Sequence, residues 1–232
     1  MKTIGLIGGM SFESTALYYR LINEEVRRRL GGLHSAQIAM ISVDFHEIEH
    51  YQHNGDWLSA GRVLAKAGQS LERAGADFLV LCTNTMHRVA DFIESAASIP
   101  LLHIADATAE EIRRHEISRV GLLGTAFTME EAFYKERMTE KFAIDVLTPD
   151  AVDRAIVHRV IYEELCRGIV DNESRTEYLR IIEDLAQRGA EGVIEGCTEI
   201  VMLVEEQHTN MRLFDTTAIH AMAAVDASLG ES

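Results

Sequence analysis

Two stretches of this 232-residue chain repeat one another, and this duplication limits the folds open to it. The run Gly75-Ala-Asp-Phe-Leu-Val-Leu-Cys82-Thr83 recurs 114 positions later as Gly189-Ala-Glu-Gly-Val-Ile-Glu-Gly196-Cys197. The apolar run Ile4–Gly8 resembles Val120–Gly124, 116 positions later. Two copies of about one hundred residues indicate a duplicated domain, because solenoids repeat shorter units many times.

Short apolar runs alternate with helical patterns along both copies, which is typical of parallel sheets covered by helices. We therefore expect an α/β protein with two pseudo-symmetric domains, each a parallel sheet of about four strands flanked by helices. Residues 1–106 plus 210–232 should form the first domain, and residues 107–209 the second. Besides the two repeated runs, the expected strands are 3–7, 37–43, 101–104, 119–123, 143–147 and 212–214.

Capping residues mark several helix starts. Ser11 is expected to cap a helix that runs to about Leu30 and is closed by Gly31-Gly32. Thr128-Met-Glu-Glu131 has the pattern of a capping box, for a helix that continues to about Phe142. Residues 44–55 are expected to form a polar loop or a short helix.

Composition excludes some classes of partner. The formal charge of −15 argues against nucleic acid, which requires clustered Lys and Arg. No apolar run approaches the ~18 residues that a membrane span needs. Only three cysteines are present, too few for a disulfide framework in a chain of this size, so we expect free thiols in a reducing cytoplasm.

The ends of the two repeated strands are the candidate site. Ligands of open α/β sheets bind at the carboxyl ends of the strands. If the two domains are related by an approximate two-fold axis, these ends meet in one inter-domain cleft. Thr83 and Cys197 occupy equivalent positions in the repeat, so they would face each other across the ligand.

Cys197 is the first candidate for chemistry. It follows an apolar strand and precedes Thr198-Glu199, where a helix could begin. A thiol at a helix N-terminus is stabilised as thiolate, which predicts a pKa below the usual value of about 8.5. A buried structural cysteine is the alternative.

Thr83 is a weaker acid than a thiol and needs activation by its neighbours. The alternative role is an N-cap for the helix that carries Met86 and His87. Asn84 and Thr85 could offer N–H groups to a carboxylate. Cys82 precedes Thr83 on the strand, so its side chain is expected in the core, with a substitute catalytic role as the alternative.

Other polar groups carry weaker signals. His46, His50 and His53 have a spacing that could suggest a metal site, but a solvated polar segment is the favoured interpretation. Gly8-Gly9 lacks the dinucleotide-binding spacing, and indicates either a close backbone approach or a tight turn.

Taken together, these motifs resemble the cofactor-independent aspartate/glutamate racemases over essentially the whole chain. The resemblance is carried by the opening Ile4–Ser11, by Asn84-Thr85-Met86-His87, by Gly196-Cys197-Thr198-Glu199 and by Phe214–His220. In such enzymes two cysteines flank the substrate α-carbon. Cys197 matches the second, whereas Thr83 stands where the first would be, so the chain looks like a Thr/Cys subgroup.

The resemblance implies an amino-acid racemase that interconverts L- and D-aspartate or glutamate without pyridoxal phosphate or metal, in a homodimer. Thr83 and Cys197 would be catalytic. Substrate-binding positions implied by the match are Met10, Gln52, Thr83, Asn84, Thr85, Thr198 and Glu199.

Two other functions stay open at this point. Decarboxylases and cis–trans isomerases belong to the same broad superfamily. A decarboxylase of this superfamily protonates an enediolate with a single thiol. A non-enzymatic two-domain binder of a small anion is the other alternative, although a binding site needs no thiol at a strand end.

Overall fold

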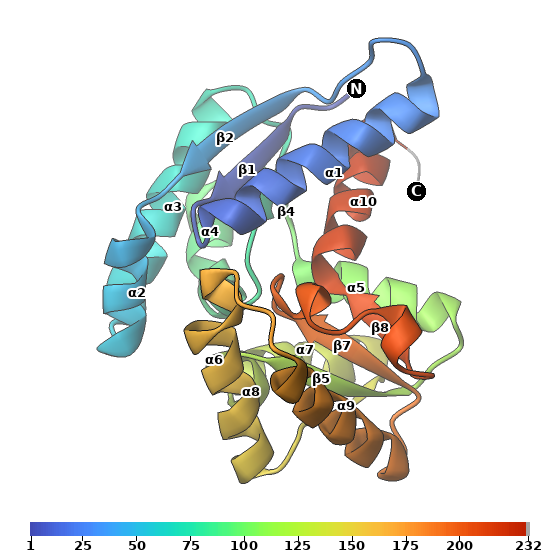
Figure 1. Ribbon diagram of the computed structural model, residues 1–232. Helices are drawn as coiled ribbons and strands as arrows, with labels where there is room; N and C mark the ends of the chain where they lie inside the picture. The colour runs from blue at the N-terminus through green and yellow to red at the C-terminus, as the bar shows by residue number, and fades with distance from the viewer. Residues whose placement is uncertain (231–232) are drawn as a thin grey trace. The chain divides into compact units, whose positions relative to one another are not determined.

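A computed structural model describes residues 1–230. The chain divides into two compact units (Figure 1). The first contains residues 1–104 and the described residues from His220 onward, and the second contains Ala105–Ile219. Within residues 1–230, no helix combines the length and apolar character that crossing a membrane requires.

The first unit contains a four-stranded parallel sheet in the order β2-β1-β3-β4. Its elements in chain order are β1 (Ile4–Gly8), α1 (Phe12–Leu30), β2 (Ile38–Ser42), α2 (Phe45–His53), α3 (Trp57–Arg73), β3 (Phe78–Leu81), the 3₁₀ helix η1 (Thr85–Val89), α4 (Ala90–Ala96) and β4 (Leu101–Leu102). The last helix, α10 (Thr216–Leu229), returns to this unit at His220.

The second unit repeats this plan with the order β6-β5-β7-β8, again all parallel. Its elements are α5 (Ile104–Arg114), β5 (Arg119–Gly124), α6 (Ala126–Glu130), α7 (Ala132–Phe142), β6 (Asp145–Leu147), α8 (Ala151–Glu163), η2 (Leu165–Arg167), α9 (Asn172–Gln187), β7 (Gly192–Gly196), η3 (Ile200–Met202), η4 (Glu206–His208) and β8 (Arg212–Asp215). The expected α/β architecture with two four-stranded parallel sheets is therefore confirmed.

Strand register supports the internal duplication. In the first sheet Ile7 of β1 pairs with Leu81 of β3. Adding the sequence offsets of 116 and 114 gives Leu123 and Glu195, and these two residues pair between β5 and β7. The two sheets thus share topology and register, and Thr83 and Cys197 occupy equivalent positions after β3 and β7.

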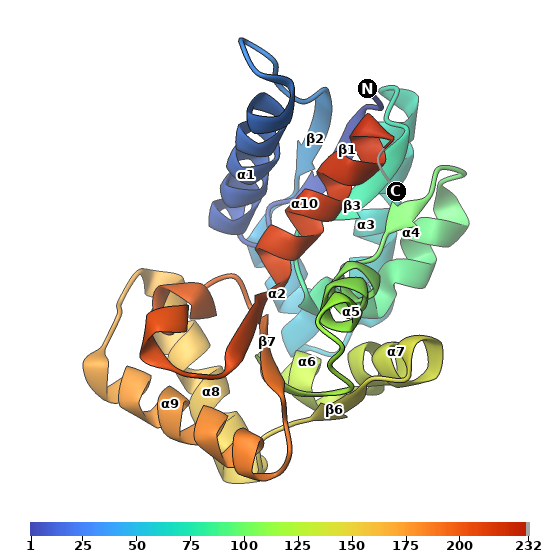
Figure 2. The same cartoon turned by 90° about the vertical axis from the view of Figure 1, so that its right-hand side faces the viewer.

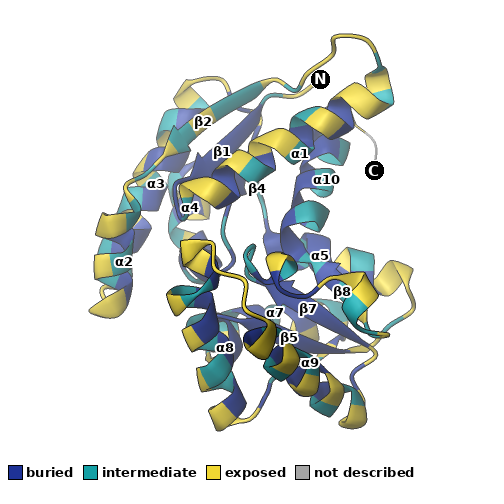
Figure 3. Ribbon diagram, in the orientation of Figure 1, coloured by how far each residue is buried: buried dark blue, intermediate teal, exposed yellow. Residues whose placement is uncertain are grey.

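Alternating side chains of the first sheet enter two cores. Leu79 and Leu81 pack with α3 and α4 on one face, whereas Val80 and Cys82 pack with α1 and α10 on the other. Figure 2 shows α1 and α10 on the same side of that sheet, and Figure 3 shows β1 buried, whereas the edge strand β2 is partly exposed. Because neighbouring strand residues point to opposite faces, β3 is buried on both sides.

Short polar side chains cap the N-termini of several helices. The Ser11 hydroxyl accepts a hydrogen bond from the Ser14 N–H at the start of α1, and Gly31 ends that helix with φ 75°. Asp44 caps α2, so residues 45–53 form the short helix rather than a loop. Asp56 caps α3.

The expected capping box at Thr128 is wrong. Thr125 caps α6 and accepts from the N–H of Thr128, which lies fully buried inside that helix. Glu131 has an extended backbone and separates α6 from α7. The segment therefore forms two helices, because the chain leaves helical geometry at Glu131.

The boundary between the units differs from the expected one at residues 105–106 and 210–219. β8 pairs in parallel with β7, so residues 210–219 belong to the second unit instead of the first. Phe214 of β8 is buried over Gly192, where an added Cβ would lie 2.7 Å from the Phe214 ring. The glycine thus makes room for the edge strand on this sheet.

Candidate functional site

In the first unit, the loop after β3 carries Thr83, Asn84 and Thr85. The Thr83 side chain is partly exposed, while Asn84 and Thr85 are buried. The Thr83 N–H donates to the carbonyl of Leu81 at 2.9 Å, which turns the chain directly after the strand.

Thr83 does not serve as a helix cap. The helix that carries Met86 and His87 is the 3₁₀ helix η1, and its flanking residue is Asn84, which has helical φ and ψ angles and makes no side-chain cap bond. The alternative cap role for Thr83 is therefore wrong.

Met10 and Gln52 both lie next to this loop. The Gln52 side-chain amide donates to the Met86 sulfur at 2.8 Å, and Met10 and Met86 belong to one buried apolar cluster. Met10 follows Gly9, whose φ is 98° and where an added Cβ would lie 2.2 Å from the carbonyl oxygen of Val43. The close approach at the glycine pair is thus made to the chain's own backbone, at the end of β2.

In the second unit, the loop after β7 brings three of the expected residues together. The Cys197 thiol donates to Oε2 of Glu199 at 3.0 Å. The Thr198 hydroxyl donates to the same oxygen at 2.7 Å. All three side chains are half-buried, so a carboxylate acceptor lies within reach of the thiol proton.

The expectation of a lowered Cys197 pKa is wrong. Burial, followed by the neighbouring Glu199 carboxylate, raises the pKa of the thiol well above its usual value. The helix that follows is η3, a single 3₁₀ turn of three residues that starts at Ile200. Such a turn offers little dipole to a thiolate, whereas the Glu199 charge opposes one.

The other two thiols have different surroundings. Cys82 is fully buried in the core with α1 and α10, as the strand alternation predicts, and burial raises its pKa. Cys166 lies on η2 and is an exposed residue, but burial of its thiol, followed by the charge of Glu199, raises its pKa to about 12.

The histidines of the 44–55 segment are exposed on α2. His53 lies 3.5 Å from Glu49, one turn earlier. Among residues 1–230, no three His, Cys, Asp or Glu side chains are arranged to hold a metal ion.

Sequence reasoning missed three buried polar side chains near these loops. His87 and His220 lie within the motifs of the resemblance, but no role was assigned to either, and both are buried in the first unit. Glu195 is buried on β7, two residues before Cys197, and burial with the nearby Asp215 and Glu206 carboxylates raises its pKa to about 8. A lone charge within the apolar run Gly192–Gly196 was the available signal.

Comparisons with known proteins agree with this fold. A crystal structure from Yersinia pestis, described as a "putative Asp/Glu Racemase", is 57% identical, with a TM-score of 0.94 over 99% of this chain and 100% of that one. An aspartate racemase homologue from Pyrococcus horikoshii OT3 is 33% identical, with a TM-score of 0.85 over 99% and 100% of the two chains. The broad specificity amino-acid racemase RacX of Bacillus subtilis (strain 168) is 22% identical over 97% of this chain and 98% of its own.

The family match covers nearly the same span as these relatives. Residues 7–224 match the Asp/Glu/hydantoin racemases, a range that includes the loops after β3 and β7. The chain belongs to the Asp/Glu/hydantoin racemase family.

Proposed function

We propose that this chain is an amino-acid racemase that interconverts the enantiomers of aspartate or glutamate through the side chains of Cys197 and Thr83. The observation that carries the proposal is the Cys197 thiol, which donates to a carboxylate at the carboxyl end of β7. Family membership and the racemase relatives from Yersinia pestis and Pyrococcus horikoshii support the substrate class.

Glu199 supplies the proton acceptor that the thiol needs. A thiol with a raised pKa is protonated at neutral pH, and only the thiolate can remove an α-proton. Oε2 of Glu199 lies 3.0 Å from Cys197 Sγ, within hydrogen-bond reach of that proton. Proton transfer to Glu199 would form the thiolate as the substrate binds and water leaves.

Thr83 is the proposed partner on the opposite face of the α-carbon. Its register equivalence to Cys197 and its partly exposed side chain support this role. Since a hydroxyl is a weaker acid than a thiol, the two half-reactions differ in their acid–base groups. The N–H groups near Asn84, Thr85 and Thr198 would stabilise the charge that develops on the substrate carboxylate.

Exchange of the α-proton in deuterium oxide tests the proposal. We expect the wild-type protein to exchange the α-proton of aspartate or glutamate and to racemise that amino acid. Proton NMR measures the exchange and chiral chromatography measures the racemisation, across a panel of amino acids. Cys197→Ala should slow both processes by about 10²–10⁴-fold, the usual contribution of a positioned acid–base group. Glu199→Gln should slow them too, because it removes the proton acceptor.

Cys166→Ser is the matched control, since it removes a second thiol whose pKa the Glu199 charge also raises, and it should leave exchange unchanged. Thr83→Ala should reduce racemisation more than it reduces exchange from one enantiomer, and Thr83→Cys should raise racemisation of at least one substrate. Near-parental exchange in Cys197→Ala would refute the assignment. Release of carbon dioxide would instead identify a decarboxylase.

A further inference from the structure

Two histidines lie close together in the first unit, next to the loop that carries Thr83. His87 belongs to η1 and His220 to α10, and their ring centroids lie 5.9 Å apart. A third ring, His103, stacks on His87 with a centroid distance of 4.4 Å. All three side chains are buried, which is unusual for rings of this polarity unless hydrogen bonds compensate.

His87 bonds to the backbone through both ring nitrogens. Nδ1 lies 2.8 Å from the carbonyl oxygen of Thr83, and Nε2 lies 3.2 Å from the backbone nitrogen of Ile104. A carbonyl can only accept and an amide N–H can only donate. The ring is therefore neutral, with its proton on Nδ1, and it links Thr83 to Ile104, the first residue of α5.

His220 also bonds the nearby backbone, but its proton is on Nε2, in the tautomer opposite to that of His87. Its Nε2 donates to the carbonyl of Leu102 at 2.9 Å, and its Nδ1 lies 2.9 Å from the Tyr18 hydroxyl. Burial lowers the pKa of His220 to about 4, so Nδ1 accepts the hydroxyl proton at neutral pH. The segment 102–104, to which His87 is bonded, is thus itself bonded to His220 of α10, which in turn bonds Tyr18 of α1.

We propose that His87 is a positioning residue, which orients the Thr83 peptide, and with it the Thr83 hydroxyl, through its hydrogen bonds to the Thr83 carbonyl and the Ile104 N–H. The inference rests on the proposed function, in which Thr83 acts on the substrate. An acid–base group must be held within about 0.5 Å of its productive position, and misplacement by about 1 Å can cost about 10²-fold in rate. The buried ring provides that constraint without contact between His87 and the substrate.

Substitutions at His87 separate its two hydrogen bonds. In His87→Asn, the amide nitrogen is bonded to Cγ, as Nδ1 is in histidine, so it can still donate to the Thr83 carbonyl. The shorter side chain does not reach the Ile104 N–H. His87→Leu makes neither bond. We expect His87→Leu to lower kcat for racemisation about 10–10²-fold while KM changes less than about threefold, and His87→Asn to recover most of that loss.

A double-mutant cycle with Thr83→Ala tests whether His87 affects kcat through Thr83. If His87 acts through Thr83, His87→Leu should cost little further kcat in the Thr83→Ala background. Equal costs in both backgrounds, or unchanged kcat in His87→Leu, would overturn the positioning role and leave the racemase proposal intact. Unchanged racemisation in Thr83→Ala would remove the Thr83 role and the positioning role together.

Val89→Ala controls for general damage to η1, because Val89 is a buried apolar residue of the same 3₁₀ helix. It should lower thermal stability without a matching fall in kcat. If Val89→Ala lowers kcat as much as His87→Leu at similar stability, the effect of His87 is structural and the proposal fails.

Discussion

Glu195 places a carboxyl group inside β7, where the equivalent residue of the first sheet is Leu81. Asp215 pairs with it on β8, so the two side chains share one face of the sheet. Oε1 of Glu195 is buried and has no hydrogen-bond partner within residues 1–230. Burial, then the charges of Asp215 and Glu206, raise the pKa of Glu195 from 4.5 to about 8, so the group is mainly protonated at neutral pH.

This raised pKa predicts how stability depends on pH. The stabilising contribution of Glu195 is fully present below about pH 4.5, and is lost as the pH rises through about 8, because the folded chain must then bury a charge beside two others. Glu195→Gln removes the titration. We expect the variant to gain stability over wild type as pH rises, on the order of 1–3 kcal/mol at about pH 9 and near zero at about pH 5.

Thermal unfolding at about pH 5, 7 and 9 measures this difference. Glu136→Gln is the control, since Glu136 is exposed on α7 of the same unit. A stability difference between Glu195→Gln and wild type that stays constant across these pH values would show that Glu195 is ionised throughout.

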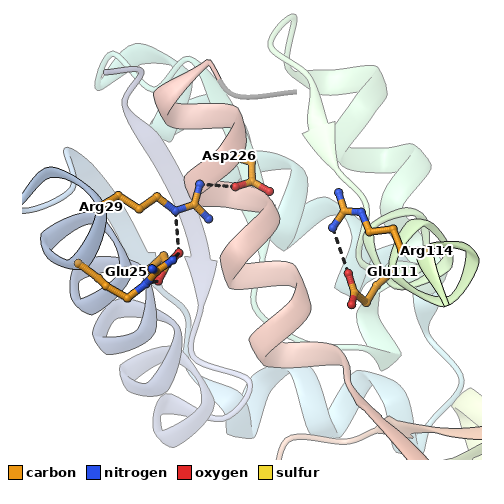
Figure 4. Close-up of polar contacts among 6 residues, drawn as sticks. Glu25, Arg29, Glu111, Arg114 and Asp226 are labelled. Atoms are coloured by element: carbon orange, nitrogen blue, oxygen red, sulfur yellow. Dashed lines mark hydrogen bonds and ion pairs between the residues drawn. The ribbon is translucent and has the colours of Figure 1, made fainter.

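At the scale of elements, Arg29 adds an ionic link between α1 and α10 to their apolar packing. Arg29 of α1 bonds Glu25 at 2.6 Å and Asp226 of α10 at 2.5 Å (Figure 4). The Arg29 side chain is 20% exposed, so its charges are only partly screened by solvent. Figure 4 also shows Arg114 with Glu111 on α5, an ion pair within one helix whose arginine is 67% exposed.

These two arginines should differ in their effect on stability. Arg29→Met removes the ion pair between α1 and α10 and leaves Glu25 and Asp226 with fewer partners, so we expect a loss of about 1–3 kcal/mol. Arg114→Met breaks an exposed pair within a helix and should cost less than about 0.5 kcal/mol. Urea denaturation gives both free energies of unfolding, and similar losses would contradict a special role for Arg29.

Local sequence signals predicted the elements better than their long-range pairing. Ser11 caps α1 because its short polar side chain bonds the backbone a few residues ahead, which the sequence alone can show. Thr125 and Thr128 both have a hydroxyl that could cap a helix, and only the backbone conformation determines that Thr125 is the cap. The partner of β8 depends on how Phe214 fits over Gly192, a contact between distant residues.

The same distinction holds for the candidate site. Duplication placed Thr83 and Cys197 after equivalent strands, and register agrees. The raised pKa of Cys197 was not predictable, because it depends on the path that brings Glu199 back to the thiol. The link from His87 to Ile104 likewise joins residues 17 positions apart.

At the scale of the whole molecule, the two units share topology and register but have diverged at equivalent positions. Thr83 in one corresponds to Cys197 in the other, and Leu81 corresponds to Glu195. Each unit therefore has a different side chain at the same place in its fold. A racemase built this way would have unequal acid–base groups for its two directions.

Thermodynamics limits what this asymmetry can do. Free enantiomers in achiral water have equal free energies, so the equilibrium constant of racemisation is one. The values of kcat/KM must therefore be equal in the two directions, whichever group meets each enantiomer. We expect slower reprotonation by Thr83 to lower kcat in one direction, with a compensating change in KM.

Progress curves started from pure L- and pure D-substrate test this expectation. At concentrations well below both KM values, the two first-order constants should be equal, whereas at saturating concentrations the initial rates should differ. Thr83→Cys, which makes the two acid–base groups alike, should bring the saturated rates closer together. Reproducibly different first-order constants, with stable enzyme, would mean that the chain converts its substrate by a reaction other than simple racemisation.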